Sequence, residues 1–144
     1  MSAPAPGLLP DVGAELPALR TALTLTDLIA YAGATWDWHR LHYDPEYLAA
    51  HGLPAPVVDG QLFGALLVRQ AQDAFGPKAF VRGLHFRFAS PVFAGESVVC
   101  AARVTARERQ PDGAVLVSVA ASVEVVGERA RVAVAPAGLE VELR

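Results

Sequence analysis

Polar and apolar residues alternate through most of the second half of the chain. The alternation runs through residues 80–88, 97–107 and 114–126, and a fourth segment begins at Ala130. A period of two is the pattern of a β-strand that buries one of its faces. Turn residues separate the later segments, at Pro111-Asp112-Gly113 and at Gly127. Consecutive alternating segments joined by short turns predict an antiparallel sheet.

The segment from Asp59-Gly60-Gln61 to about Phe75 has a helical pattern instead. Its first turns are apolar on nearly every side, through Leu62, Phe63, Ala65, Leu66, Leu67 and Val68. Polar residues return only at Arg69. A helix that is apolar all round is a buried one. We therefore predict an α+β fold in which the antiparallel sheet wraps around this central apolar helix.

Two shorter helices precede the central one. Thr24 and Asp27 resemble a capping box, and apolar residues follow at positions 25, 28, 29 and 32. This pattern predicts a helix with one apolar stripe that ends at Gly33. The next helix is predicted to begin after Asp44, with Pro45 in its first position, and to stop at Gly52.

The length of 144 residues suits one domain. Residues 1–20 are rich in Pro, Ala and Gly and are predicted to form an extended N-terminal arm, which leaves residues 21–144 as the single domain. The first ten residues lack the basic region and long apolar stretch of a signal peptide, and no run approaches 18 apolar residues. We expect a cytoplasmic protein with no membrane partner.

Composition and charge narrow the range of partners. Apolar residues make up 53% of the chain and charged ones only 19%, an excess that predicts a subunit interface, either in a homodimer or in a hetero-oligomer. The net charge of −3 argues against nucleic-acid binding. Cys100 is the only cysteine, so it forms no intrachain disulfide, and we expect it to be a small buried residue of a strand.

Residues capable of acid–base chemistry gather between Asp37 and Asp44. Asp37 and His42 form a candidate catalytic pair, because an imidazole exchanges protons near neutral pH and a carboxylate can orient it or activate a water. Alternatively, both side chains satisfy backbone groups of their loop. A metal site from His39-x-x-His42 with Asp37 and Asp44 is disfavoured, because no cysteine or second histidine pair accompanies it. We expect neither metal nor cofactor.

The start of the central helix is the second candidate element. The free N–H groups and the positive dipole end of a buried helix suit a carbonyl that develops negative charge. Gly60 permits close approach of a ligand to the backbone. In the alternative interpretation, Asp59 is simply a helix cap and Gly60 a hinge. Together with an acid–base pair, the functional interpretation matches what thioester chemistry needs.

The same residues carry a resemblance to a known family. The run Asp37-Trp38-His39-Arg40-Leu41-His42-Tyr43-Asp44 resembles the Asp-x-Asn-Pro-x-His-x-Asp motif of MaoC-like (R)-specific enoyl-CoA hydratases and dehydratases. Residues 86–96 are similar to that family's Arg-Phe-x-x-Pro-Val-x-x-Gly-Asp/Glu segment, and the resemblance covers about residues 22–135. It implies a hot-dog fold and interconversion of 2-enoyl and (R)-3-hydroxyacyl thioesters, carried by CoA or a carrier protein.

Within this resemblance, Asp37 and His42 are the expected catalytic residues. Gly60, Gln61, Asp59 and His39 are expected to bind the thioester or its oxyanion. Two departures alter the pocket walls: His39-Arg40 replaces Asn-Pro, and Asp59-Gly60 replaces His-Gly. This form of the motif, Asp-Trp-x-x-x-His-x-Asp, looks similar to branches of the family that include hydratases of bulky acyl groups and steroid side chains. Some of those hydratases are hetero-oligomers.

Two other functions stay open. A hot-dog acyl-CoA thioesterase would use the same helix N-terminus with a carboxylate on or near it, for which Asp59 is the candidate. A non-catalytic hot-dog subunit that supports an active partner is the third possibility. Retention of both Asp37 and His42 argues against this last one.

Overall fold

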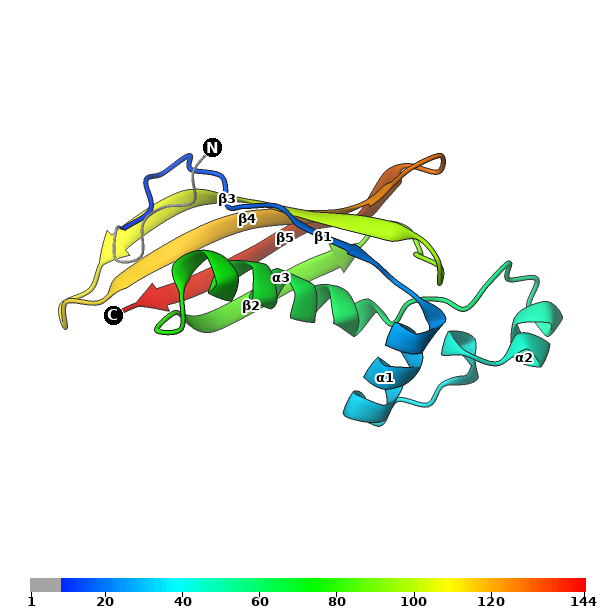
Figure 1. Cartoon of the computed structure of the whole chain (residues 1–144). Coiled ribbons are helices and arrows are strands. Elements are labelled where there is room, and N and C mark those ends of the chain that lie inside the picture. The colour runs from blue at the N-terminus through cyan, green and yellow to red at the C-terminus, as the bar shows by residue number, and fades with distance from the viewer. Residues whose placement is uncertain (1–8) are drawn as a thin grey trace.

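The computed structural model describes residues 9–144, so the first eight residues of the predicted arm lie outside it. Figure 1 shows a sheet with one long helix along one of its faces. In chain order the elements of the described part are β1 (Leu19–Ala22), α1 (Leu25–Thr35), the 3-10 helix η1 (Arg40–His42), α2 (Pro45–Ala50), α3 (Gly60–Phe75), β2 (Phe80–Phe88), β3 (Ser97–Arg109), β4 (Val115–Val126) and β5 (Arg131–Leu143).

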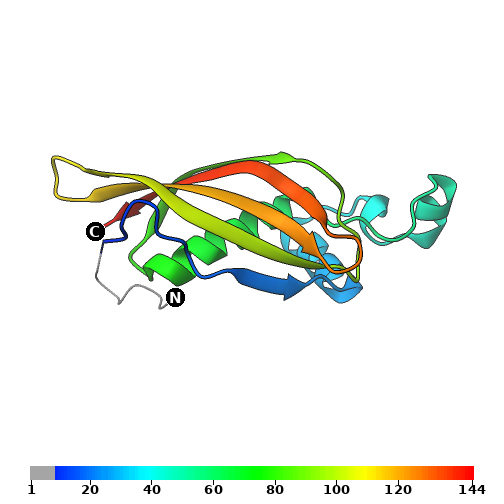
Figure 2. The ribbon, with the colours of Figure 1, turned by 90° about the horizontal axis from the view of Figure 1, so that it is seen from above.

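The five strands form one sheet in the order β1-β3-β4-β5-β2, and every neighbouring pair is antiparallel. The sheet curves over α3, while α1 and α2 lie beyond the N-terminal end of this helix (Figures 1 and 2). The predicted α+β fold, an antiparallel sheet around a central helix, is thereby confirmed.

Alternation along β3 and β4 builds most of the core. The inward residues of these strands are buried: Val98, Cys100, Ala102, Val104, Val115, Val117, Val119, Val123 and Val125. They face buried residues of α3, among them Phe63, Leu66 and Leu67. Burial raises the pKa of the Cys100 thiol to about 11, so the thiol stays protonated and packs as an apolar group, as expected from the sequence.

The sheet covers α3 less completely than its apolar first turns suggest. Gln61, Ala65 and Arg69 form an exposed stripe, because one curved sheet covers only one side of a helix. On the covered side the helix carries small residues where aromatic rings approach. A Cβ on Gly64 would lie 2.9 Å from a ring carbon of Phe86, so this glycine lets the edge strand β2 close on the helix.

Helix α1 also departs from its prediction. It continues through Gly33 to Thr35 and ends at Trp36, which has the left-handed backbone (φ 60°) that normally favours glycine. Gly33 instead lies against the ring of Trp38: a Cβ on Gly33 would lie 3.7 Å from a carbon of this ring. Leu28 and Ala32 are buried as expected, whereas Leu25 and Ile29 are exposed.

The ends of the sheet differ in detail from the predicted pattern. The predicted boundary between arm and domain, after residue 20, falls inside β1. Residues before it already join the sheet, since Leu16 N donates to Ala102 O on β3 (2.9 Å). The division into arm and domain stays a prediction. The last strand begins at Arg131 rather than Ala130, and a register shift opposite Val123 buries both Ala133 and Val134. Along residues 9–144, no helix combines the length and hydropathy needed to cross a membrane.

Candidate active site

Three loops meet at the N-terminus of α3 and are held together by main-chain hydrogen bonds. Val57 N donates to Leu41 O (3.1 Å), which joins the loop before α3 to η1. Val58 N donates to Val92 O (2.8 Å), which joins the same loop to the segment after β2. The loop before α3 is therefore bonded to both other segments, and side chains from distant parts of the sequence converge at this point.

Asp37 enters the site from the end of α1. The left-handed residue Trp36 turns the chain out of the helix, and the Asp37 carboxylate then accepts a hydrogen bond from His39 N (3.2 Å). The His39 ring turns back to cap η1, because its Nδ1 accepts from Leu41 N (3.0 Å). His39 is exposed, and its predicted role in substrate binding stays a prediction.

His42 is buried, with 8% of its surface exposed, and its tautomer follows from one hydrogen bond. The Nδ1 atom lies 2.6 Å from Val57 O. A carbonyl oxygen only accepts, so Nδ1 must carry the hydrogen and donate. In the neutral ring Nε2 is then the unprotonated nitrogen, available to take a proton. The loop that carries Val57 thus fixes the orientation of His42 and leaves Nε2 as the nitrogen that can exchange a proton.

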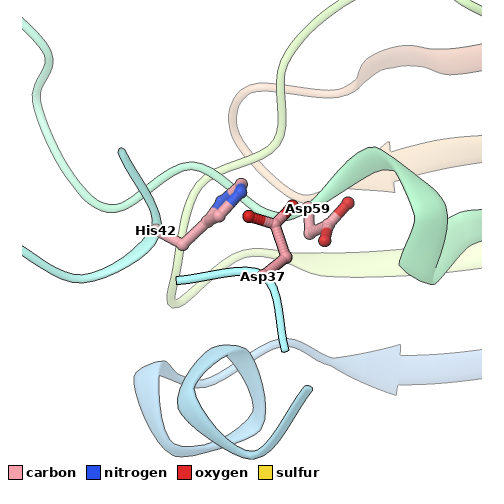
Figure 3. A group of neighbouring side chains, drawn as sticks. All are labelled: Asp37, His42 and Asp59. Atoms are coloured by element: carbon pink, nitrogen blue, oxygen red, sulfur yellow. The ribbon is translucent and has the colours of Figure 1, made fainter. Parts of the chain in front are cut away.

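The structure brings Asp37, His42 and Asp59 together. Each offers one ligand-type atom, and these atoms all lie within 4.8 Å of one another (Figure 3). Asp59 also caps α3, since its Oδ1 accepts from Gln61 N (2.9 Å). The two interpretations of Asp59 are therefore not exclusive: the residue is a helix cap and also a member of the cluster.

A cavity of about 420 Å³ opens beside this cluster. Its walls are largely apolar and are formed by Leu41, His42, Val57, Val58, Gly60, Phe63, Phe88, Ala89, Ser90, Pro91 and Val92. At Gly60 a Cβ would lie 2.3 Å from the Phe88 ring, so only glycine fits between helix and ring. Because the N–H of Gln61 is engaged by Asp59, Gly60 is the better placed of the two predicted donors.

Sequence reasoning missed Tyr31. This residue of α1 lies beside His42 and Asp59, around a crevice too small to admit a water molecule. Burial raises the pKa of its hydroxyl, and the negative charge of Asp59 raises it further. The available signal was its position three residues after Leu28, on the buried side of the helix.

A second missed feature is the ion pair that holds one wall of the cavity. Arg131 of β5 donates to both carboxylate oxygens of Glu96 (2.9 and 2.6 Å) and to Pro91 O (2.8 Å). Glu96 also accepts from Phe93 N (2.9 Å), and the Arg131 guanidinium lowers the pKa of the Glu96 carboxyl. Glu96 belongs to the recognised motif, but nothing in the sequence pairs it with a residue 35 positions away.

The metal set considered from the sequence is not assembled here. Asp44 caps α2 and binds Arg40 (2.6 Å), whose guanidinium lowers the pKa of the Asp44 carboxyl. Asp37, His42 and Asp59 are the three residues whose spacing could suit a cation. Activity without a metal therefore stays a prediction.

The chain matches known proteins in both sequence and structure. It belongs to the family of MaoC-like domain proteins, whose model matches residues 11–128. This is a family of hydratases and dehydratases, and the expected hot-dog fold and family membership are both confirmed.

Two relatives and one solved structure define the neighbourhood. The chain is 32% identical over 87 residues to an (R)-specific enoyl-CoA hydratase of Aeromonas caviae, covering 59% of this chain and 65% of the relative. It is 35% identical over 74 residues to a mitochondrial 3-hydroxyacyl-[acyl-carrier-protein] dehydratase of Arabidopsis thaliana, covering 51% and 43%. It thus spans less than two thirds of either relative. The ChsH1–ChsH2 complex of Mycobacterium tuberculosis matches with a TM-score of 0.80 at 28% identity, covering 94% of this chain and all of that one.

The Glu96–Arg131 pair leads to a pH-dependent prediction. The folded-state pKa of Glu96 is lowered, so its contribution to stability is present above the unfolded pKa of about 4.3 and is lost as pH falls through the folded value. Glu96→Gln should lower the free energy of unfolding by about 1–3 kcal/mol at pH 7, and by less at pH 3.5. Urea unfolding at both pH values measures this difference.

Glu124→Gln is the matched control, because Glu124 is exposed on β4. It should change the free energy of unfolding little at either pH. An equal loss for Glu96→Gln at both pH values would mean that the charge of Glu96 contributes nothing.

Proposed function

We propose that this chain interconverts trans-2-enoyl thioesters and (R)-3-hydroxyacyl thioesters by adding or removing water. The supporting observation is that Asp37 lies close to an oriented His42, and that His42 and Gly60 both line an apolar cavity. This reaction needs three parts: an acid–base pair, a cavity for the acyl group and a helix N-terminus.

In the proposed reaction the thioester oxygen binds the N–H of Gly60 at the positive end of α3. Asp37 and His42 hold and activate one water, which loses a proton to the site as its oxygen attacks C3. Negative charge then moves onto the thioester oxygen, where the helix dipole and the N–H stabilise it. A proton delivered to C2 completes the hydration, and the reverse sequence is the dehydration.

The substrate is proposed as a thioester of CoA or of acyl carrier protein. The relatives support both carriers, since one is named for enoyl-CoA and the other for the acyl-carrier-protein substrate. The apolar walls of the cavity suit a hydrocarbon group. The scheme uses no metal or cofactor, and the cytoplasmic location stays a prediction.

Hydrolysis of the thioester is a second candidate, and one observation favours it. Asp59 stands at the start of α3, next to Gly60, where a thioesterase would place its carboxylate. Hydration has the stronger support, because Asp37 and His42 match the motif of the hydratases. An assay that follows both products separates the two reactions.

Asp37→Asn and His42→Ala test the catalytic pair. Each should lower turnover by about 10²–10⁴-fold, because either loss leaves the water without its activating partner. The double variant should be scarcely slower than the slower single variant, since the two residues act on the same water. His51→Ala is the control: its Nδ1 also bonds a backbone carbonyl, that of Tyr47 (2.8 Å), but at the end of α2. It should keep its turnover.

The assay records loss of enoyl absorbance and release of free thiol in parallel, with and without a chelator. Hydration removes the conjugated double bond and releases no thiol. Thiol release that tracks substrate loss would contradict the proposal and favour hydrolysis. Silence in both channels, relieved only by adding a second hot-dog subunit, would identify a half-enzyme.

We also propose that the chain works as an oligomer built on the edge strand β2. This strand is an outer strand of the sheet, and it exposes Phe80 (65%) and Phe88 (56%), an unprotected edge for a monomer. The solved ChsH1–ChsH2 complex, in which two differently named chains assemble, supports an assembled form. The partner proposed for this chain is a second copy or another hot-dog chain.

Light scattering after size exclusion tests the homodimer. The wild type should have about twice the monomer mass of 15.2 kDa, and Phe80→Lys should shift it toward that mass. Val126→Lys, at an exposed apolar position of the inner strand β4, should leave the dimer intact. A wild type that stays monomeric at high concentration would contradict the homodimer and leave the hetero-oligomer.

A further inference from the structure

We propose that Asp59 is a third catalytic residue, the one that accepts the proton of the attacking water. This inference rests on the proposed hydration and assigns its base. Asp37 then orients the water and His42, and His42 delivers the proton to C2.

Among residues 9–144, only one oxygen of the Asp59 carboxylate has a hydrogen-bond partner. Capping α3 uses Oδ1, which accepts from Gln61 N. The same residue belongs to the group whose ligand-type atoms lie within 4.8 Å of one another, together with Asp37 and His42. A single water is small enough to bond several groups at this spacing. Capping alone does not require this proximity to a buried histidine.

While His42 is neutral, the groups that Asp37, His42 and Asp59 present to one another include no hydrogen-bond donor. With Nδ1 bound to Val57 O, the group presents Nε2 of His42 and the oxygens of two carboxylates, all of them acceptors when His42 is neutral. A proton on Nε2 converts the set into one donor between two acceptors. The group then contains an acid, Nε2–H, and a base, a carboxylate, at the same time.

The position of Asp59 next to Gly60 decides which carboxylate acts as the base. A permanent negative charge beside the N–H that binds the thioester oxygen opposes the charge that develops there. If Asp59 takes the water proton, its charge disappears as the charge on the thioester oxygen appears. The number of negative charges around the N-terminus of α3, with Asp37 included, then stays constant through the step. Asp37 is exposed and lies on another loop, so it offers no such compensation.

The step balances in atoms and charge. The water oxygen bonds to C3, its proton passes to Asp59, and the electron pair of the double bond moves toward C2 and the thioester. C2 then takes the proton from Nε2 of His42. Transfer of the proton from Asp59 to Nε2 restores the starting state, and no other reactant is consumed.

The test uses substitutions that keep the cap. Asn caps a helix about as well as Asp, so Asp59→Asn should fold normally. Its kcat for hydration should fall by about 10²–10⁴-fold, with KM nearly unchanged, because the lost group acts on the water and not on the thioester. Asp59→Glu should recover part of the loss by restoring a carboxylate. Asp59→Ser, another capping residue, replaces the Asn variant if that one is unstable.

Asp44→Asn is the matched control. It is the same substitution at another helix cap, that of α2, and Asp44 is bound by Arg40 outside the cluster. It should keep kcat, with any loss confined to thermal stability.

Each outcome of these assays either supports the role of Asp59 or contradicts it. A normal kcat in Asp59→Asn, or a raised KM alone, would reduce Asp59 to a cap or a binding residue and overturn the inference, while the hydratase proposal would stand. A wild type that releases thiol without hydrating, or does neither, would overturn the proposed function itself. A loss of kcat with intact folding and partial recovery in Asp59→Glu supports the inference.

Discussion

The burial of α3 against the concave face of the sheet is the constraint on which the site depends. It brings the first residue of the helix, Gly60, to the place where three loops converge. Phe86 and Phe88 of the edge strand can close on the helix only because positions 64 and 60 carry no side chain. The same packing leaves a cavity of about 420 Å³ at the helix N-terminus rather than a filled core. Fold and site are therefore consequences of one packing arrangement.

Patterns with a clear period could be predicted from the sequence. The alternation in β3 and β4 and the apolar run of α3 predict the sheet and its central helix, because burial on one face imposes those periods. The proximity of Asp37 and His42 could also be predicted, because motif spacing within one loop is local information. The exposed stripe of α3 was missed, since apolar residues alone do not reveal which side the sheet leaves open.

Features that depend on distant residues could not be predicted. The partner of Glu96 lies on β5, and Tyr31 meets Asp59 only after α1 packs beside the start of α3. Gly33 suggested a helix end but serves as a contact for Trp38. Asp59 is the instructive case. Its local role as a cap was readable from the sequence, whereas its proximity to His42 comes from the hydrogen bonds that join the loops.

In the proposed function, this site adds a water to C3 of an enoyl thioester and leaves the thioester bond intact. The most direct measurement is the mass and chirality of the product formed from trans-2-enoyl-CoA in water enriched in oxygen-18. The expected product is an intact CoA thioester with one heavy oxygen at C3 in the (R) configuration. Heavy oxygen in a free carboxylate, accompanied by free CoA thiol, would contradict it.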